Sequence, residues 1–266
     1  MAYGQPLLTG NTLIRNLKGF CLWTLIMNLT VFPLMIAWTV ISVALFPIGF
    51  LFWKVITRWD AARIMRHFVW IYGRVWIAIM VPFVRFTREG FKEEKIKSSC
   101  IFVLNHLSFF DTYCLALIPF HNVIFVVRSW PFKMFWYAPF MHLAEYMNAE
   151  SMGWKEMCMT SKEKLVKGVG LLFFPEAHRS RDGKIGRFHS GAFRIALETG
   201  VPIVPLCIMG TDVLFPPGRW FLKPARVHLR ALKPVNPRDF SGPNAHIEMR
   251  KQVKNMMAQA ISSIKP

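Results

Sequence analysis

A histidine and an aspartate lie five positions apart directly after a short apolar run of the chain. The run Cys100–Leu104 is followed by Asn105 and His106, and Asp111 comes in the next turn. This spacing lets the carboxylate fold back onto the imidazole, accept a hydrogen bond from one ring nitrogen and fix the tautomer. The second nitrogen is then free to take a proton as a general base. The spacing alone is a weak signal, because an aspartate that only favours a helix N-terminus satisfies it equally well.

A second polar cluster follows another apolar run. Val169–Phe174 is followed by Glu176, Arg179 and Ser180. Arginine offers a planar fork of donors that suits phosphate oxygens, and a glutamate can orient it or accept a hydrogen bond from a hydroxyl group. A surface ion pair between the glutamate and the arginine is the alternative.

The elements that carry these residues alternate along the chain after Val81. Short runs that are apolar throughout and alternate with helices predict an α/β domain, with a mostly parallel central sheet flanked by helices. In such sheets ligands gather at the carboxyl ends of the strands, which is where both polar clusters stand. The expected strands are Phe83–Arg88, Cys100–Leu104, Val123–Val127, Val169–Phe174, Val201–Met209 and Arg226–Leu232, and the expected helices lie near Phe109–Ile118, Trp154–Val166, Ala192–Thr199 and His246–Ile264.

One expected strand, Val201–Met209, contains Pro202 and Pro205. Proline cannot donate a hydrogen bond to a strand ladder, so we expect these residues at a sheet edge or at the start of a strand. In that position they could form one wall of a cleft.

The N-terminal part of the chain has the composition of a membrane element. No charged residue occurs from Cys21 to Trp53, a run of 33 residues. As one helix the run would be about 50 Å long, against about 30 Å for the hydrocarbon core of a bilayer, and two full spans would need roughly 40 residues. It therefore predicts either a helical hairpin that dips into the membrane or one tilted helix. Basic residues on both sides, with Pro33 and Pro47 inside, favour the hairpin and place both ends in the cytoplasm.

The next stretch, Ala61–Val81, mixes arginines with large aromatic residues. It predicts an amphipathic helix in the headgroup layer, and a helix that covers the protein's own core is the alternative. We divide the chain into a membrane-embedded element (1–57), an interfacial helix (58–82) and an α/β domain (83–266). A cleaved signal sequence is the alternative for the first part, although its apolar region would be only about 7–15 residues long.

The composition favours a membrane partner. Hydrophobic residues make up 53% of the 266 residues, and the formal net charge is +18. Apolar surface can insert into a bilayer while basic residues attract its anionic lipids. Nucleic-acid binders rarely need this much apolar surface, so we expect no nucleic-acid partner. The five cysteines form no CxxC pair, which predicts reduced thiols in a cytosolic environment and no zinc site.

Three blocks of the sequence together resemble the glycerolipid acyltransferase family, which includes the 1-acylglycerol-3-phosphate acyltransferases. Asn105 to Asp111 is similar to that family's Asn-His-x-Ser-x-x-Asp block. Phe174 to Ser180 is similar to its Phe-Pro-Glu-Gly-Thr-Arg-Ser block, and Val201 to Pro205 to its Val-Pro-Ile-x-Pro block. The blocks stand in the family's order and roughly its spacing, and the resemblance covers about 84–232.

The resemblance implies an α/β catalytic domain behind N-terminal membrane helices, and a reaction without an acyl-enzyme. His106 would be the general base and Asp111 its orienting partner, so that a lipid hydroxyl attacks the thioester of acyl-CoA or acyl carrier protein directly. No cofactor is expected, and Ser108 is better placed to cap the following helix than to act as a nucleophile. Substrate contacts are expected from Asn105, Ser108, Glu176, Arg179, Ser180 and Arg128.

The sequence departs from the family pattern in the acceptor-binding blocks. Ala177-His178 stands where Gly-Thr is usual, Phe188-His189 stands where lysines are common, and Tyr146–Glu150 does not resemble the family's Ile-Asp-Arg block. These changes leave the reaction type intact and leave the acceptor open between 1-acylglycerol-3-phosphate, another lysophospholipid, a lyso-aminolipid and another membrane hydroxyl compound. The cations that could replace the missing ones are Arg128, Lys133, Arg181, Lys184 and Arg187.

Two other functions fit the same residues. A metal-dependent lipid hydrolase would use His106, Asp111, Glu176 and His178 as ligands, although the sequence has no HExxH pair. A non-catalytic lipid-binding membrane protein would use the same cleft without chemistry, and the presence of both His106 and Asp111 argues against it. We therefore predict a membrane-bound O-acyltransferase whose catalytic domain lies on the cytoplasmic side of the membrane.

Overall fold

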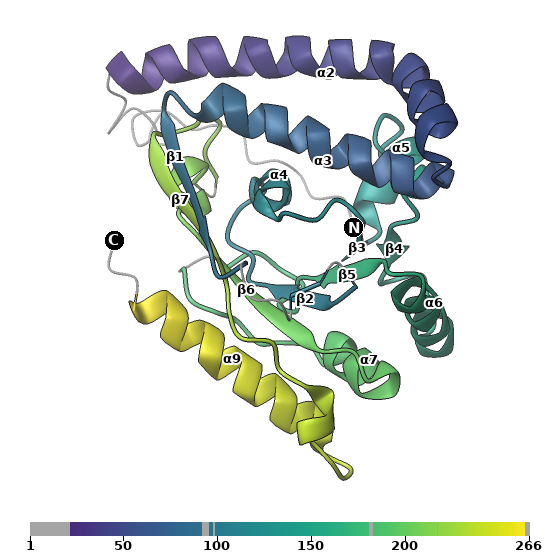
Figure 1. Cartoon of the computed structure of the whole chain (residues 1–266). Coiled ribbons are helices and arrows are strands. Elements are labelled where there is room, and N and C mark those ends of the chain that lie inside the picture. Colours follow the sequence, from purple (N-terminus) through teal and green to yellow (C-terminus); the bar gives the residue numbers. More distant parts are fainter. Residues whose placement is uncertain (1–21, 92–95, 98, 181–182, 217, 264–266) are drawn as a thin grey trace, which may run out of the picture.

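The computed structural model describes residues 22–91, 96–97, 99–180, 183–216 and 218–263. Arg181 and the first 21 residues of the predicted membrane element lie outside this range. A seven-stranded sheet forms the centre, in the order β1-β7-β6-β2-β5-β3-β4, with helices on both of its faces (Figure 1). The strands are β1 (Val84–Glu89), β2 (Ile101–Leu104), β3 (Val123–Val127), β4 (Met147–Asn148), β5 (Gly170–Phe173), β6 (Ile203–Met209) and β7 (Ala225–Ala231).

The predicted α/β fold with a mostly parallel sheet is confirmed. Every neighbouring pair of strands is parallel except β6 and β7, which run antiparallel. The central strands β2, β3, β5 and β6 are apolar throughout because both of their faces are covered, as β2 shows, whereas β1 and β7 contain charged residues. In β2, Phe102 and Leu104 belong to the core beneath α2 and α3, whereas Ile101 and Val103 belong to the core on the opposite face.

The predicted helices are also present, and the structure adds short ones that the sequence did not indicate. The stretch expected near Phe109–Ile118 forms a single α-helical turn followed by a 3₁₀ turn. The helical elements are α2 (Leu22–Thr57), α3 (Ala61–Met80), α4 (Asp111–Cys114), η1 (Leu115–Leu117), η2 (Trp130–Lys133), α5 (Ala138–Leu143), α6 (Trp154–Val166), α7 (Gly191–Thr199), α8 (Thr211–Leu214), η3 (Pro237–Asp239) and α9 (Ala245–Ser263).

The N-terminal apolar run forms one continuous helix, so the favoured hairpin is wrong and the alternative of a single helix is correct. α2 has 36 residues, with Pro33 and Pro47 inside it. Neither proline breaks the helix, which bends towards its C-terminal end (Figure 1).

Most of α2 is not covered by protein. Met27, Val31 and Met35 are buried and recur every four residues, which gives a narrow stripe that packs on the domain. Large apolar side chains elsewhere on the helix, such as Ile48 and Val55, are exposed. By length and composition α2 is the one helix among the described residues that could cross a membrane.

α3 lies between α2 and the α/β domain (Figure 1). Arg66 is buried, and its guanidinium donates to the Asn122 side chain and to the Ala144 carbonyl, each at 2.9 Å. The indole of Trp76 stacks on Tyr113 with 4.1 Å between ring centroids. Residues expected to face lipid headgroups therefore anchor α3 to the domain, as the core-covering alternative requires. Contact between α3 and lipid stays a prediction.

The prolines were expected at a sheet edge or at the start of a strand; Pro202 is at the start of a strand, and Pro205 is in neither position. Pro202 precedes β6, and its carbonyl accepts from Ile101. Pro205 lies inside a central strand, paired with β2 on one side. On the other side the β7 ladder ends at Ala231, and the Pro205 carbonyl accepts from the Leu232 amide. The missing N–H is tolerated because the regular ladder stops there.

Aromatic and imidazole rings pack together where the α2–α3 turn meets the domain. Trp53 stacks on Trp59, Trp59 stacks on His121, and the rings of His67 and His121 meet edge to face at 4.8 Å. Burial lowers the pKa of His121 to about 4, and the neighbouring His67, Arg63 and Arg66 act in the same direction.

This pKa predicts a pH-dependent stability. Between pH 4 and the ordinary histidine value of 6.5 the unfolded chain binds a proton at His121 that the folded chain does not. The free energy of unfolding should therefore fall as the pH is lowered from 6.5 to 4. Replacing His121 with Phe, which keeps a ring against Trp59, should reduce this slope in thermal unfolding at several pH values. An unchanged slope in the variant would assign the pH dependence to other groups.

Candidate active site

The sheet brings the two polar clusters of the sequence together. β2 and β5 are adjacent and parallel, so the residues that follow them meet at one edge of the sheet. The backbone links them directly: the Ser180 amide donates to the His106 carbonyl at 2.8 Å. The predicted convergence of the His106 and Glu176 blocks is therefore what the structure shows.

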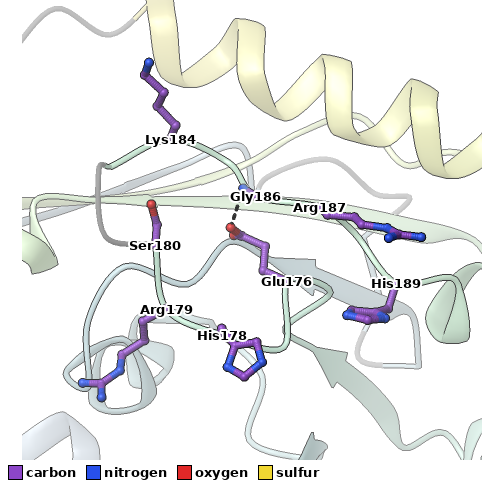
Figure 2. Close-up of a pocket in the computed structure, with 8 residues that line it drawn as sticks. All are labelled: Glu176, His178, Arg179, Ser180, Lys184, Gly186, Arg187 and His189. Atoms are coloured by element: carbon purple, nitrogen blue, oxygen red, sulfur yellow. Dashed lines mark hydrogen bonds between the residues drawn. The ribbon is translucent and has the colours of Figure 1, made fainter.

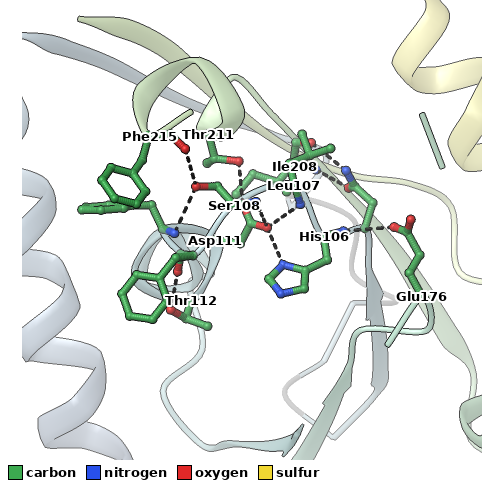
Figure 3. Close-up of polar contacts among 12 residues, drawn as sticks. His106, Leu107, Ser108, Asp111, Thr112, Glu176, Ile208, Thr211 and Phe215 are labelled. Carbon is green, nitrogen blue, oxygen red and sulfur yellow. Dashed lines mark hydrogen bonds and ion pairs between the residues drawn. The ribbon is translucent and has the colours of Figure 1, made fainter. Parts of the chain in front are cut away.

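His106 and Asp111 form a close pair (Figure 3). Nδ1 of His106 lies 2.7 Å from Oδ2 of Asp111. An ionised carboxylate can only accept, so Nδ1 carries the proton and Nε2 presents its lone pair. The imidazole is 19% exposed and the carboxylate 0%. Asp111 is thus sealed inside, while the ring that it orients remains open to a substrate.

Three groups besides His106 donate hydrogen bonds to the carboxylate of Asp111. Its Oδ2 also accepts from the backbone amides of Leu107 and Ser108, at 2.7 and 2.9 Å. Its Oδ1 accepts from the hydroxyl of Thr211, which is fully buried. Our sequence analysis missed Thr211, although it follows the end of β6, at the same edge of the sheet as the other site residues.

Asn105 and Ser108, both predicted to contact substrate, are buried and bonded to the protein. The Asn105 amide donates to the Ile208 carbonyl at 2.9 Å and accepts from the Ile208 amide at 2.8 Å, which extends the pairing of β2 with β6. The Ser108 hydroxyl donates to the Phe215 carbonyl at 3.2 Å. This geometry favours structural roles for both residues.

Glu176 joins the histidine block to the following loop. Its Oε1 accepts from the His106 amide at 3.0 Å, and its Oε2 accepts from the Gly186 amide at 2.7 Å. Burial raises the pKa of Glu176 above its ordinary value, while the two backbone donors act in the opposite direction. Gly186 is a second residue that the sequence did not single out. A Cβ atom there would come within 3.0 Å of Glu176 Oε2.

An open pocket of about 370 Å³ lies beside Glu176 (Figure 2). Three exposed cations line it, and their side chains extend away from Glu176 in different directions. The predicted residues Arg179 and Ser180 and two of the candidate replacement cations are thus brought together. The lining residues are Glu176, His178, Arg179, Ser180, Lys184, Gly186, Arg187 and His189.

Arg128 lies near this pocket but already has a partner. Its guanidinium forms an ion pair with Glu150 and approaches His178 Nδ1 at 3.3 Å. Hydrogen bonds from the Ser129 backbone and from Arg128 lower the pKa of Glu150 to about 2. Arg128 therefore brings less net charge to a substrate than Arg179 does.

The ligand set of a metal-dependent hydrolase does not assemble. Within the described ranges, no three His, Cys, Asp or Glu side chains lie together as a group that could hold a metal ion. His106 Nδ1 is engaged with Asp111, and both oxygens of Glu176 accept backbone hydrogen bonds. What the arrangement can do is take a proton at His106 Nε2, beside a cationic pocket.

A comparison with protein families matches residues 84–209 to the model of the family described as Acyltransferase. Two curated relatives are chloroplastic 1-acyl-sn-glycerol-3-phosphate acyltransferases. The one from Brassica napus is 34% identical over 59% of this chain and 46% of its own length. The one from Arabidopsis thaliana is 33% identical over 65% of this chain and 49% of its own. The chain thus matches about half the length of these relatives.

A solved structure also resembles the chain over most of its length. It is the 1-acyl-sn-glycerophosphate (LPA) acyltransferase PlsC from Thermotoga maritima, with a TM-score of 0.68 and 25% sequence identity. The match covers 90% of this chain and 98% of that one. It therefore includes elements outside residues 84–209.

Proposed function

We propose that this chain is a glycerolipid acyltransferase, which transfers a fatty acyl group from an acyl thioester to the free hydroxyl of a lysophospholipid. The preferred acceptor in this proposal is 1-acylglycerol-3-phosphate, the acceptor named for the relatives. The donor is acyl-CoA or acyl carrier protein. The sequence departures in the acceptor blocks make other lysophospholipids the alternative acceptors.

The observation that carries the proposal is the orientation of His106. With Nδ1 held by Asp111, Nε2 presents its lone pair on a partly exposed ring, and no hydrogen bond to it occurs within the described part of the chain. Nε2 takes the proton of the acceptor hydroxyl as its oxygen attacks the thioester carbonyl. The tetrahedral intermediate then collapses, the C–S bond breaks, and the imidazolium returns the proton to the leaving thiolate. No acyl-enzyme is needed.

The cationic pocket supports an acceptor that carries a phosphate. Arg179, Lys184 and Arg187 line it beside Glu176, whose carboxylate is bonded to the His106 backbone. A phosphate there would lie close to the dyad, and a guanidinium suits its oxygens. The exposed apolar surface of α2 supports placement in a membrane, where such an acceptor resides. Placement of the domain on the cytoplasmic side is part of this proposal.

The test is an acyl-transfer assay on the purified protein in detergent. Radiolabelled acyl-CoA and acyl carrier protein thioesters are offered separately with 1-acylglycerol-3-phosphate, lysophosphatidylcholine and monoacylglycerol. Labelled phosphatidic acid, unaffected by a chelator, is the expected product. Release of free fatty acid that a chelator stops would support the hydrolase instead, and lipid binding without product would support the non-catalytic alternative.

Replacing Arg179 with Ala should weaken binding of a phosphorylated acceptor. Loss of a hydrogen bond to a charged group should raise its KM by about 10- to 100-fold, with a smaller change in kcat. The KM for monoacylglycerol, which has no phosphate, should stay the same. Arg238→Ala, at an exposed arginine of η3 outside the pocket, is the matched control. An equal rise in KM for both acceptors in Arg179→Ala would show that this arginine does not bind phosphate.

A further inference from the structure

The segment between β6 and β7 contacts both the dyad and the apolar helix α2. At one end Thr211 donates to the carboxylate of Asp111. At the other end the backbone of Leu222 is hydrogen-bonded to the side chain of Asn28, a polar residue of α2. Both contacts are directional and use a polar side chain in an apolar setting, so packing alone does not explain them.

The contact of Thr211 completes the fixation of Asp111. Three donors converge on Oδ2, whereas Thr211 is the partner recorded for Oδ1 within the described residues. Rotation about the Cβ–Cγ bond moves both oxygens, so with Thr211 in place it would break hydrogen bonds on both sides of the carboxylate. Gly210 sets the position of Thr211: its φ is +84°, and a Cβ atom would lie 1.9 Å from the Arg226 carbonyl oxygen.

The contact of Asn28 holds the other end of the segment. Its amide accepts from the Leu222 amide at 2.8 Å and donates to the Leu222 carbonyl at 2.9 Å, as a neighbouring strand would. Two backbone bonds connect this point to α8: Lys223 donates to Leu214, and Phe215 donates to Thr211. Leu214 and Leu222 are both fully buried.

We propose that Thr211 and Asn28 are positioning residues for the dyad. Thr211 acts directly on Asp111, and Asn28 acts by holding against α2 the segment that carries Thr211. α2 then orders the active site in addition to any contact with lipid. The effect on turnover rests on the proposed acyltransferase function, whereas the effect on geometry does not.

The first test replaces the Thr211 hydroxyl. Thr211→Val keeps the shape and removes the donor, and Thr211→Ser keeps the donor. We expect kcat of Thr211→Val to fall by about 10- to 100-fold, because small misplacements of a catalytic group cost rates of this order. The KM values should change little, and Thr211→Ser should recover most of the rate. A wild-type kcat in Thr211→Val, in an enzyme that His106→Ala inactivates, would overturn the proposal.

The second test addresses Asn28 in detergent solution, where attachment to a bilayer does not limit the rate. We expect Asn28→Leu to lower kcat by about 2- to 30-fold. Thr30→Val is the control on the same helix, because among the described residues the Thr30 hydroxyl donates to carbonyls of α2 itself, those of Ile26 and Met27. Equal losses in both variants would remove the specific role of Asn28. In the double variant with Thr211→Val, the effect of Asn28→Leu should shrink, because the two residues act through one path.

Crystal structures of the wild type and of Thr211→Val separate this inference from the proposed function. If the wild type transfers no acyl group, the proposed function fails and the structures still decide the positioning role. In the variant the contact of 2.7 Å between His106 Nδ1 and Asp111 Oδ2 should lengthen or break. Its retention with unchanged side-chain angles would overturn the role of Thr211. Melting temperatures near that of the wild type would exclude a general loss of folding as the cause.

Discussion

Replacing His106 with Ala should lower acyl transfer by about 10²- to 10⁴-fold, the range that a general base contributes. The loss should appear in kcat, because the proposed role of the imidazole is to take the proton of the acceptor hydroxyl, and His106 does not line the cationic pocket. Acyl transfer measured with radiolabelled thioester at saturating acceptor gives this number directly. The side chain is partly exposed, so the variant should unfold at nearly the same temperature as the wild type.

His189→Ala is the matched control, since this histidine is exposed and lines the pocket beside the site. It should keep most of the turnover, and any loss should appear in the KM of the acceptor. Turnover in His106→Ala within a few-fold of the wild type would contradict the proposed mechanism, whatever the result for His189.

Asp111→Asn should lower kcat almost as much as the loss of the histidine, by about 10²- to 10⁴-fold. Asparagine fits the space, but its NH₂ group can displace an N–H donor or leave His106 in the wrong tautomer; a change of this kind in a serine-protease triad costs about 10⁴-fold. The pH dependence of kcat should also change, because the imidazolium formed in the reaction loses its negative partner. Steady-state rates between pH 5 and 9 measure both effects.

Asp111→Ala is a poorer test of the pair than Asp111→Asn. An aspartate that only orients a base could be removed without unfolding the protein. The structure instead places the carboxylate among the amides of Leu107 and Ser108 and the hydroxyl of Thr211, all buried. Removing it leaves these donors without a partner, at about 1–3 kcal/mol for each. We therefore expect Asp111→Ala to lower the melting temperature, and Asp111→Asn to lower it less. Full turnover in folded Asp111→Asn would show that the pair is not catalytic.

The central strands were predictable because burial on both faces leaves a continuous apolar run in the sequence. β3 begins and ends where expected, at Val123 and Val127. β4 and α5 were missed because the two residues of β4 and the six of α5 are too short for a periodic pattern. The prediction of a helical hairpin was wrong for another reason. Flanking charges mark the ends of an apolar run, but the local sequence does not reveal that the helix continues past Pro33 and Pro47.

The dyad was predictable in part because its two members are close in sequence. The rule that ligands gather at strand ends placed Glu176 near His106 as well. Thr211 stands 100 positions from Asp111, and no local pattern connects them. Asn105 shows the opposite case. It belongs to a recognisable block, yet its amide pairs with the backbone of Ile208, a contact that only the neighbouring strand reveals.

The antiparallel pairing of β6 and β7 has a consequence for how this fold can diversify. If β7 ran parallel to β6, the chain between them would have to cross a face of the sheet. Because β7 is antiparallel, the connection leaves β6 and enters β7 at the same end of the two strands. The exposed side chains of that connection, such as Trp220, can change without altering a strand pairing or the buried contacts of Thr211, Leu214 and Leu222. Natural variation at such exposed positions would change the surroundings of the dyad while the contacts that hold the fold stay in place.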